Sequence, residues 1–353
     1  MRRRFIRCSP GPRALLGLAI LAALLLTMAL PAARAGEDLV AGTYDQLDTL
    51  RDRKLHQLRQ YLDRVLDLAR AAACDDALTG FFAVKRRYLA LQEHAPPPPD
   101  ARAAMAAAER RLQEHYLANY LAFHDILFVD RGGLVFHSIR GEADAGQNLF
   151  EPPLRDTALV RRLQADPDAG FVDYEYYAAS DEPSAFFVEP VHVAGRRAGW
   201  LILQSTIDKI NRIFDRTEQA GRTSEVFLVS RERLMLTDSR FRAGTSILEQ
   251  HLSDANIDAK FAERRGHKIV TDYRGERALT SFQVVPVLNT EWLLIAKIDE
   301  DEVVTRAWRD RDLGPALLAA VAASKPAPAD APAEPESQTR VDMDEFRRTE
   351  PGQ

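Results

Sequence analysis

Cysteine is scarce in this sequence of 353 residues, and basic residues do not outnumber acidic ones. The two cysteines, Cys8 and Cys74, exclude a disulfide-rich scaffold and a four-cysteine zinc site. With 47 Lys and Arg against 52 Asp and Glu, the net charge of −5 provides no basic surface for a nucleic-acid backbone, so no nucleic-acid partner is expected. Cys74 closes an alanine-rich stretch that begins at Ala71, which predicts a small buried residue of a helix.

Catalytic and metal-binding motifs are also missing. The histidines show no HxH or HExxH spacing, and the sequence has neither a G-x-S-x-G turn nor a Cys-His arrangement. The pair His124-Asp125 resembles the His-Asp pair of metal phosphohydrolases, but their further ligands do not follow. Its place between a helix and a strand favours capping or a local hydrogen bond. These absences predict a protein that is not an enzyme and that holds no cofactor or metal.

Only one long apolar run occurs, at residues 14–30, after several arginines. It ends at Pro31, which is expected to break the helix. Small residues within 33–35 mark a cleavage site before Gly36, so residues 1–35 are predicted to be a signal peptide. An uncleaved anchor is the alternative, because the run is near the lower length limit for crossing a bilayer. Both alternatives predict export to the periplasm, the second with tethering to the inner membrane.

Residues 37–126 form a predicted helical region. Apolar residues recur at helical spacing between residues 37 and 73, which predicts one long amphipathic helix. Its apolar stripe consists of Leu47, Leu50, Leu55, Leu58, Leu62, Val65 and Leu66. Because this stripe is long for a helix packed on one small domain, it is also a candidate seam for a homodimer. The charged face is expected to be solvated and paired by neighbouring acids, and its arginines are Arg51, Arg53, Arg59, Arg64 and Arg70.

Two shorter helices are expected next. Asp75 and Asp76 can cap the second helix, which must stop before the proline run at residues 96–99. A third helix is expected to begin near Asp100 and to carry a stripe of core side chains.

The hydrophobic period changes to that of β-strands at Ile126. A hairpin is expected at residues 126–139, with its turn at Asp130–Gly133. Further strands of this first sheet are predicted at residues 170–177, 185–193 and 199–204. A second set follows, with strands at 225–229, 234–236 and 292–298 and helical segments at 207–214 and 247–261. The fold class is therefore α/β (α+β), with two tandem antiparallel modules at residues 120–222 and 223–305. A Pro-, Ala- and acid-rich tail at 312–353 is predicted to be disordered.

The order and spacing of these segments resemble the double Cache family, the extracytoplasmic sensing region of bacterial chemoreceptors and sensor histidine kinases. The resemblance covers about residues 37–305 and rests on segments that include 124–130, 171–177, 225–229 and 272–275. It implies a PAS-like fold in each module and a small-molecule pocket in the first, membrane-distal module. Residues 120–222 are called the distal module below, and residues 223–305 the proximal module.

Two features depart from the family pattern. Neither a second transmembrane helix nor a cytoplasmic signalling domain is expected, so a signal would pass to a separate membrane receptor or kinase, or through a homodimer. The amino-acid-binding branch carries an Arg-x-Trp-Tyr element that is missing between Phe136 and Val191. An α-amino-acid ligand thereby loses its main support.

By their position in the resembled family, six residues are candidates for the ligand site: Asp173, Tyr174, Tyr176, Phe136, Ser138 and Phe186. Strand alternation is expected to place Asp173, Glu175 and Tyr177 on one face and Tyr174 and Tyr176 on the other. Carboxylates beside aromatic rings suit a small polar metabolite that carries an amine. The alternative is a half-buried strand whose tyrosines pack in the core and whose acids are solvated.

The sequence therefore predicts an exported sensor-like protein that binds a small polar metabolite in the distal module. The alternative is a non-catalytic interaction or scaffold protein of the envelope with a degenerate Cache fold. In the proximal module, residues 237–240 are expected to form a turn, and a second small ligand there is the alternative.

Overall fold

The computed structural model describes residues 12–92, 95–165, 168, 170–193, 195–215 and 221–309, with side chains from residue 38 onward except those of 254 and 307–309. Residues Asp38–Asp310 form one compact unit. The predicted cleavage site has no described side chains, and the predicted tail lies outside the described residues. Among the residues described, no helix is both long enough and apolar enough to cross a membrane.

The first helix, α1 (Pro12–Ala72), is longer than predicted. The break expected at Pro31 was wrong, since the backbone is helical through that residue. Proline removes one backbone hydrogen bond, and the Ala- and Leu-rich sequence on both sides favours the helix enough to outweigh that loss.

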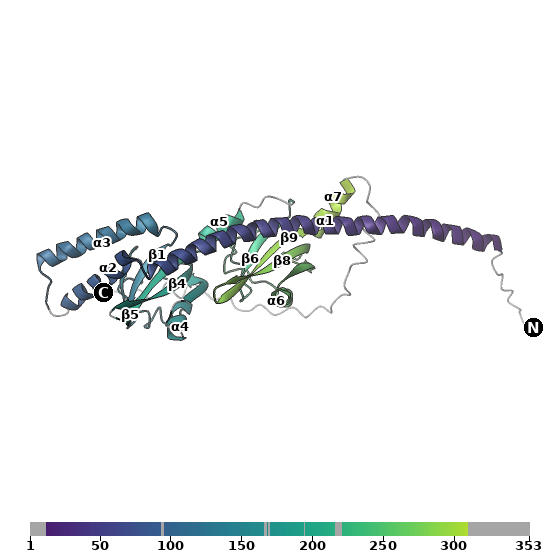
Figure 1. Cartoon of the computed structure of the whole chain (residues 1–353). Helices are drawn as coiled ribbons and strands as arrows, with labels where there is room; N and C mark the ends of the chain where they lie inside the picture. The colour runs from purple at the N-terminus through teal and green to yellow at the C-terminus, as the bar shows by residue number, and fades with distance from the viewer. Residues whose placement is uncertain are drawn as a thin grey trace, which may run out of the picture. The chain divides into compact units, whose positions relative to one another are not determined.

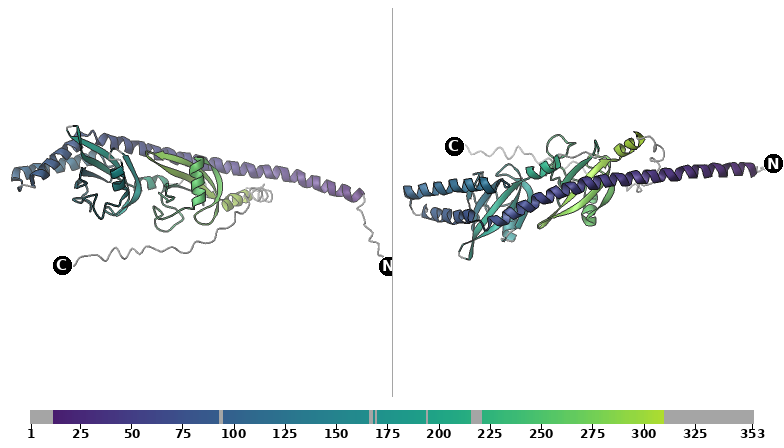
Figure 2. Two further views of the ribbon diagram at one scale, coloured as in Figure 1. Left: turned by 90° about the horizontal axis from the view of Figure 1, so that it is seen from below. Right: turned by 45° about the horizontal axis from the view of Figure 1, so that its top comes forward.

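The leucine stripe of α1 is buried inside the chain. Leu47 and Leu58 are fully inaccessible, and the stripe packs against apolar side chains of both sheets. Figures 1 and 2 show α1 running alongside both sheets. Because the chain's own sheets cover this stripe, the predicted homodimer seam is already occupied. A dimer through α1 would have to use its outward face.

Helices α2 (Asp76–Gln92) and α3 (Pro99–Asn119) pack against each other. Asp75 caps α2 as predicted, because its Oδ1 accepts the backbone N–H groups of Ala77 at 2.8 Å and Leu78 at 3.2 Å. Cys74 is exposed in the turn between α1 and α2, so the predicted buried helical position was wrong. The capping residue needs a non-helical backbone, and the chain therefore leaves α1 just before it.

The distal sheet has five antiparallel strands in the order β2-β1-β5-β4-β3. Their bounds are β1 (Asp125–Asp130), β2 (Val135–Ser138), β3 (Gly170–Tyr177), β4 (Glu182–Val193) and β5 (Arg196–Thr206). All five lie where the sequence predicts strands. In the β1–β2 turn, Gly133 has a φ of +91°, a conformation that favours glycine. A helix that was not predicted, α4 (Ala158–Ala165), packs on one face of this sheet.

Helix α5 (Asp208–Asp215) leads to the proximal sheet, which has four antiparallel strands in the order β6-β9-β8-β7. The strands are β6 (Glu225–Val229), β7 (Arg265–Thr271), β8 (Arg277–Val287) and β9 (Thr290–Asp299), and the helices are α6 (Asp254–Glu263) and α7 (Glu300–Arg309). Residues 234–236 form only isolated bridges, and the helix expected at 247–261 begins at Asp254. The reason is local pairing: Met235 donates its N–H to Gln250 O, and Leu248 donates to Met235 O.

Each sheet separates two apolar layers. The face toward α1 belongs to one core that includes side chains of both modules. The other face of the distal sheet packs against α4 and the loop before it, and we call it the α4 face. The corresponding face of the proximal sheet packs against α6 and is called the α6 face. Figure 1 shows α4 and α6 on their sheets.

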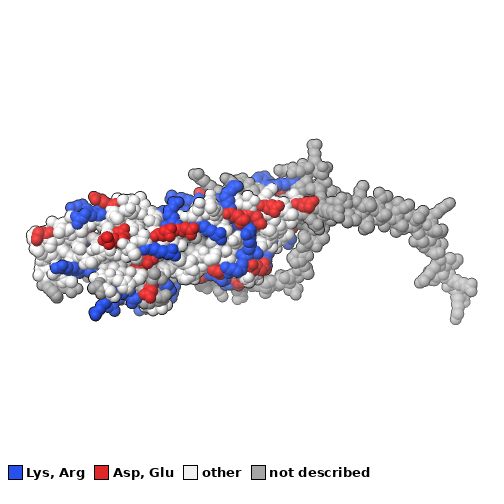
Figure 3. Space-filling view, in the orientation of Figure 1, with Lys and Arg blue, Asp and Glu red and all other residues white. Residues whose placement is uncertain are grey.

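Arg51 departs from the predicted solvated arginine face. Its side chain is fully buried, Nη1 donates to Asp48 Oδ1 at 2.8 Å and to the hydroxyl of Ser281 in β8, and Nε donates to Asp52 Oδ1 at 2.8 Å. A helix that lies on two sheets buries a wider strip than its leucines alone, and paired acids make burial of the guanidinium tolerable. The four other arginines of that face are exposed. On the surface shown in Figure 3, charges of both signs are interspersed.

Candidate ligand-binding site of the distal module

The six predicted site residues do not lie together. Asp173 and Tyr174 both contact Trp292 of β9, in the proximal module. The indole Nε1 donates to the Asp173 carboxylate at 3.0 Å from each oxygen, and the ring centroids of Tyr174 and Trp292 are 6.0 Å apart. The predicted alternation was wrong here, because a register shift between Val172 and Glu175 turns two successive side chains toward the same side.

A second register shift, at the end of β1, separates Phe136 from Ser138. Phe136 packs edge-on against Phe82 of α2, with ring centroids 4.9 Å apart. Ser138 lies on the α4 face, where its hydroxyl donates to Asp125 Oδ2 at 2.5 Å. These two residues therefore cannot line one pocket.

The last two predicted residues also lie apart. Tyr176 is 53% exposed, and its hydroxyl donates to Asp181. Phe186 is fully buried on the α4 face and packs edge-on against Tyr177, at a centroid distance of 4.8 Å. Of the six, only Ser138 and Phe186 lie on the α4 face, whereas Asp173 and Tyr174 lie on the opposite one.

That face carries a row of polar groups across one end of the sheet. Strand register places Asp125 of β1 opposite Gln204 of β5, and Gln204 opposite Phe186 of β4. Since directly opposed residues point to the same side, these side chains lie together on the α4 face. Asp144, from the loop after β2, joins them and accepts the Tyr177 hydroxyl on Oδ2 at 2.8 Å. Asp125, Asp144 and Gln204 are all fully buried.

Two of these buried groups have oxygens that accept no hydrogen bond from the described part of the chain. Gln204 Nε2 donates to Ser180 Oγ and Ser184 Oγ, both at 2.8 Å, but its Oε1 has no donor among the described residues. The same holds for Asp144 Oδ1. A buried acceptor without a partner is costly, and most such atoms in proteins are satisfied by protein, water or ligand.

More carboxylates surround the row. Glu142 Oε1 lies 2.6 Å from His124 Nε2 and 3.7 Å from Arg140 Nε, whereas its buried Oε2 has no donor among the residues that the structure describes. Glu182 Oε1 lies 3.3 Å from His124 Nδ1. His124 thus lies between two acids, a local role of the kind expected for the His124-Asp125 pair. We call Asp125, Glu142, Asp144, Glu182 and Gln204 the distal acceptor cluster.

Burial raises the pKa values of Asp144 and Asp125. Burial first, and then the carboxylates of Asp125 and Glu142, raise the pKa of Asp144 to about 6, against the opposing hydrogen bond from Tyr177. Burial also raises the pKa of Asp125, although hydrogen bonds from Ser138 and two backbone N–H groups oppose it. A cation beside Asp144 would therefore stabilise its ionised form.

The arrangement suits a small cation that donates several hydrogen bonds. An ammonium group has three N–H donors and one charge, which match the unpaired oxygens of Asp144, Gln204 and Glu142. No group of three or more potential metal ligands occurs among the described residues.

A family model described as a Cache domain matches residues 38–307. The chain belongs to the double Cache family. Cache domains of this kind are extracytoplasmic ligand-binding domains of sensors, so this chain contains a Cache-type sensor domain. The predicted fold class and family are confirmed. No curated protein matches the chain.

Solved structures with a similar fold include an extracellular ligand binding receptor from Desulfohalobium retbaense, with 14% identity and a TM-score of 0.50. That match covers 71% of this Cache chain and 40% of the receptor chain. Another is the ligand binding domain of the Pseudomonas aeruginosa amino acid chemoreceptor PctC in complex with GABA, with 16% identity, a TM-score of 0.48, and 72% and 99% of the two chains covered. At these identities the likeness concerns the fold alone.

Sequence reasoning missed Asp144, Glu142 and Gln204 as site residues. Gln204 ends the apolar strand run that begins at Gly199, and a polar residue on the buried side of such a run is a usable signal. Asp144 and Glu142 lie in an irregular loop, where no period shows which side chains turn inward.

Proposed function

We propose that this Cache chain is a periplasmic sensor component that binds a small amine at the distal acceptor cluster and leaves it chemically unchanged. The observation that carries the proposal is the pair of unpaired, fully buried oxygens, Asp144 Oδ1 and Gln204 Oε1. A ligand ammonium group would supply the missing donors and the missing charge. The apolar residues beside the row, such as Phe186 and Leu127, would contact its carbon skeleton.

Strand β3 supports a route for the signal, because it connects the cluster with the proximal module. Tyr177 at its end donates to Asp144, whereas Asp173 and Tyr174 contact Trp292. A ligand whose ammonium group attracts the Asp144 carboxylate would change the hydrogen bond from Tyr177 to Asp144. That change would favour one position of β3 over another. The ligand shifts the equilibrium only as far as its affinity differs between the two positions.

The output of the sensor would pass to a separate membrane receptor or kinase. The outward face of α1, which the sheets leave exposed, is the surface proposed for that partner or for a second copy of the chain. In the anchored alternative, residues 14–30 would hold the chain at the inner membrane.

A thermal-shift screen tests the binding step. Putrescine, ethanolamine and γ-aminobutyrate are compared with 1,4-butanediol, which lacks the ammonium group, on the wild-type chain, Asp144→Asn and Asp181→Asn. Asp181 is an exposed acid of the same module with a φ of +56°, where asparagine is well tolerated, so its variant is the matched control.

We expect at least one amine to raise the melting temperature of wild type and Asp181→Asn, with the shift lost in Asp144→Asn and absent for the diol. A ligand that binds only the folded state stabilises it by RT ln(1 + [L]/Kd), so at equal ligand concentration a larger shift reports a higher affinity. An equal shift in Asp144→Asn would place the amine elsewhere. Flat curves from folded protein would favour the envelope interaction protein instead.

A further inference from the structure

The proximal module contains a cavity on its α6 face. Its volume is about 60 Å³, roughly four times the minimum that holds one water molecule. The lining combines apolar side chains, among them Phe227, Ile257 and Ile295, with polar ones. The polar lining residues include Asn256, Lys260, Asp272, Tyr273, Thr280 and Lys297.

The position of this cavity corresponds to that of the distal acceptor cluster. In the distal sheet, register aligns Asp125, Gln204 and Phe186 across β1, β5 and β4. In the proximal sheet, register aligns Glu225, Lys297 and Thr280 across β6, β9 and β8. Each row starts at the first residue of the module's first strand and lies on the face that a short helix covers. The two modules therefore repeat one arrangement, with lysine in place of glutamine.

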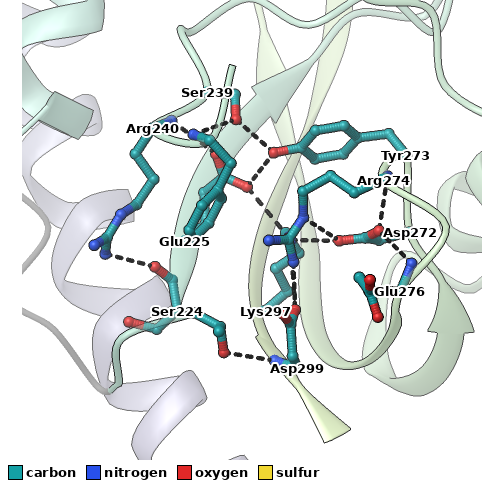
Figure 4. A network of polar contacts seen from close by, with 12 residues as sticks. Ser224, Glu225, Ser239, Arg240, Asp272, Tyr273, Arg274, Glu276, Lys297 and Asp299 are labelled. Atoms are coloured by element: carbon teal, nitrogen blue, oxygen red, sulfur yellow. Dashed lines mark hydrogen bonds and ion pairs between the residues drawn. The ribbon is translucent and has the colours of Figure 1, made fainter. Parts of the chain in front are cut away.

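Lys297 is neutralised by the protein itself. Its Nζ lies 2.5 Å from Asp272 Oδ2 and 3.6 Å from Glu225 Oε2, and only 1% of its side chain is exposed. Figure 4 shows these groups within a wider network: Tyr273 donates to Glu225 at 2.7 Å, and Arg274 binds Asp272 at 3.0 Å. The acids of this network thus have cationic partners.

Residues 237–240 are hydrogen-bonded to this network. Ser239 Oγ lies 2.5 Å from the Tyr273 hydroxyl, and Arg240 donates its backbone N–H to Glu225 and its guanidinium to Ser224 O. Asp238 Oδ1 accepts hydrogen bonds from the Thr245 hydroxyl and from the backbone N–H of Ser246. Residues 237–240 therefore form a turn, as expected, and hydrogen-bond to the network through Ser239 and Arg240.

Lys260 of α6 is different. It is 2% exposed and lines the cavity, yet no carboxylate of the described residues lies within ion-pair distance of its Nζ. Its Nζ lies over the ring of Phe282, 5.7 Å from the centroid, which is a cation–π contact. Glu263, on the same helix, pairs with Lys268 instead. A buried cation without a carboxylate partner is unfavourable unless an anion reaches it.

We propose that this cavity binds a small carboxylate, with Lys260 Nζ as its charge partner. The carboxylate would lie against Lys260 and the Asn256 amide, and a short aliphatic part would contact Phe227 and Ile257. Burial, with Lys268 nearby, lowers the pKa of Lys260 to about 8, so the ammonium form still predominates at neutral pH and is available to the anion. The two modules would then recognise opposite charges at equivalent positions, an ammonium in the distal one and a carboxylate in the proximal one.

The test is a calorimetric titration of the full chain with acetate, propionate and lactate, with inorganic phosphate as a second anion and chloride at matched ionic strength as the baseline. Lys260→Met keeps the volume and removes the charge. Lys268→Met is the matched control, because Lys268 is partly exposed and paired with Glu263 outside the cavity.

We expect one of the carboxylates to bind wild type and Lys268→Met, and its affinity to fall at least about tenfold in Lys260→Met. Lys260→Met should also melt at a higher temperature than wild type without ligand, because the unpaired buried charge is gone. Equal affinity in Lys260→Met, binding of phosphate alone, or no binding to folded wild type would overturn the proposal. The titrants have no ammonium group, so they do not test the distal acceptor cluster. Failure of the carboxylate proposal would therefore leave the amine proposal standing.

Discussion

Asp173 of the distal module accepts the indole N–H of Trp292 of the proximal module, with both carboxylate oxygens 3.0 Å from Nε1. Thr290 adds a hydroxyl donor to the same carboxylate at 3.2 Å. Trp292 is fully buried, so this contact satisfies a donor that water does not reach. Asp173 is thus a link between the modules, although the sequence alone suggested a ligand-binding role.

The first prediction concerns this link. Asp173→Ala should lower the free energy of unfolding by about 1–3 kcal/mol, because it leaves the buried Trp292 N–H without an acceptor. Asp173→Asn retains an acceptor and should cost less. Urea denaturation of the three chains measures the order, and amine stabilisation should persist in both variants. Loss of the amine shift in a folded Asp173→Asn chain would return this residue to the ligand site.

A second prediction concerns pH. The raised pKa of Asp144, about 6, means that the group favours the folded state at acidic pH and loses this contribution as the pH rises through 6. An ammonium ligand binds the ionised form, so its binding releases a proton below that pKa. Amine affinity should therefore increase between about pH 5 and pH 7, by up to about tenfold per pH unit below the pKa. Titration calorimetry in buffers of different ionisation enthalpy measures the released protons, and a flat profile would contradict the role of Asp144.

The third prediction uses two arginines of α1. Arg51→Ala should destabilise the chain by about 1–3 kcal/mol, because it removes a buried guanidinium that donates hydrogen bonds to the partly exposed Asp48 and Asp52 and to Ser281. Arg59→Ala, an exposed change on the same helix, should stay within about 0.5 kcal/mol of wild type. Guanidinium denaturation gives both values. Similar small effects for the two variants would mean that Arg51 is solvated after all.

Fourth, the lysine at the centre of the proximal network should matter for stability. Lys297→Met leaves the buried acids Glu225 and Asp272 with less positive charge, so we expect a loss of about 3–5 kcal/mol. Adding Glu225→Gln to that variant should restore part of the loss, since one uncompensated charge disappears. Thermal unfolding of the single and double variants checks the order; a double variant less stable than the single one would refute the charge explanation.

Most elements of this fold could be predicted from local patterns. Strands β3 and β6 have the predicted bounds residue for residue, since both runs are rich in β-branched or aromatic side chains. Helix α4 was missed because its eight residues barely exceed two turns, too few for a helical period to stand out. Pairing of the 234–236 segment depends on a loop more than ten residues away, which no local pattern reveals.

The candidate site was harder to predict for a physical reason. One extra residue in β3 turned Asp173 away from Tyr177, and a two-residue period cannot show where such a bulge occurs. The acceptor cluster collects Asp125, Asp144 and Gln204 from three separate segments: strand register brings Asp125 and Gln204 together, and the loop after β2 adds Asp144. The proposal of an ammonium ligand follows from residue types, whereas the proposed location depends on the pairing of the strands.

The most direct test of the account is a crystal structure of the chain with the amine that gives the largest thermal shift. The account predicts the ligand nitrogen within hydrogen-bond distance of Asp144 Oδ1 and Gln204 Oε1, on the α4 face of the distal sheet. An amine bound instead beside Asp173, or in the proximal cavity with the acceptor cluster unchanged, would contradict it.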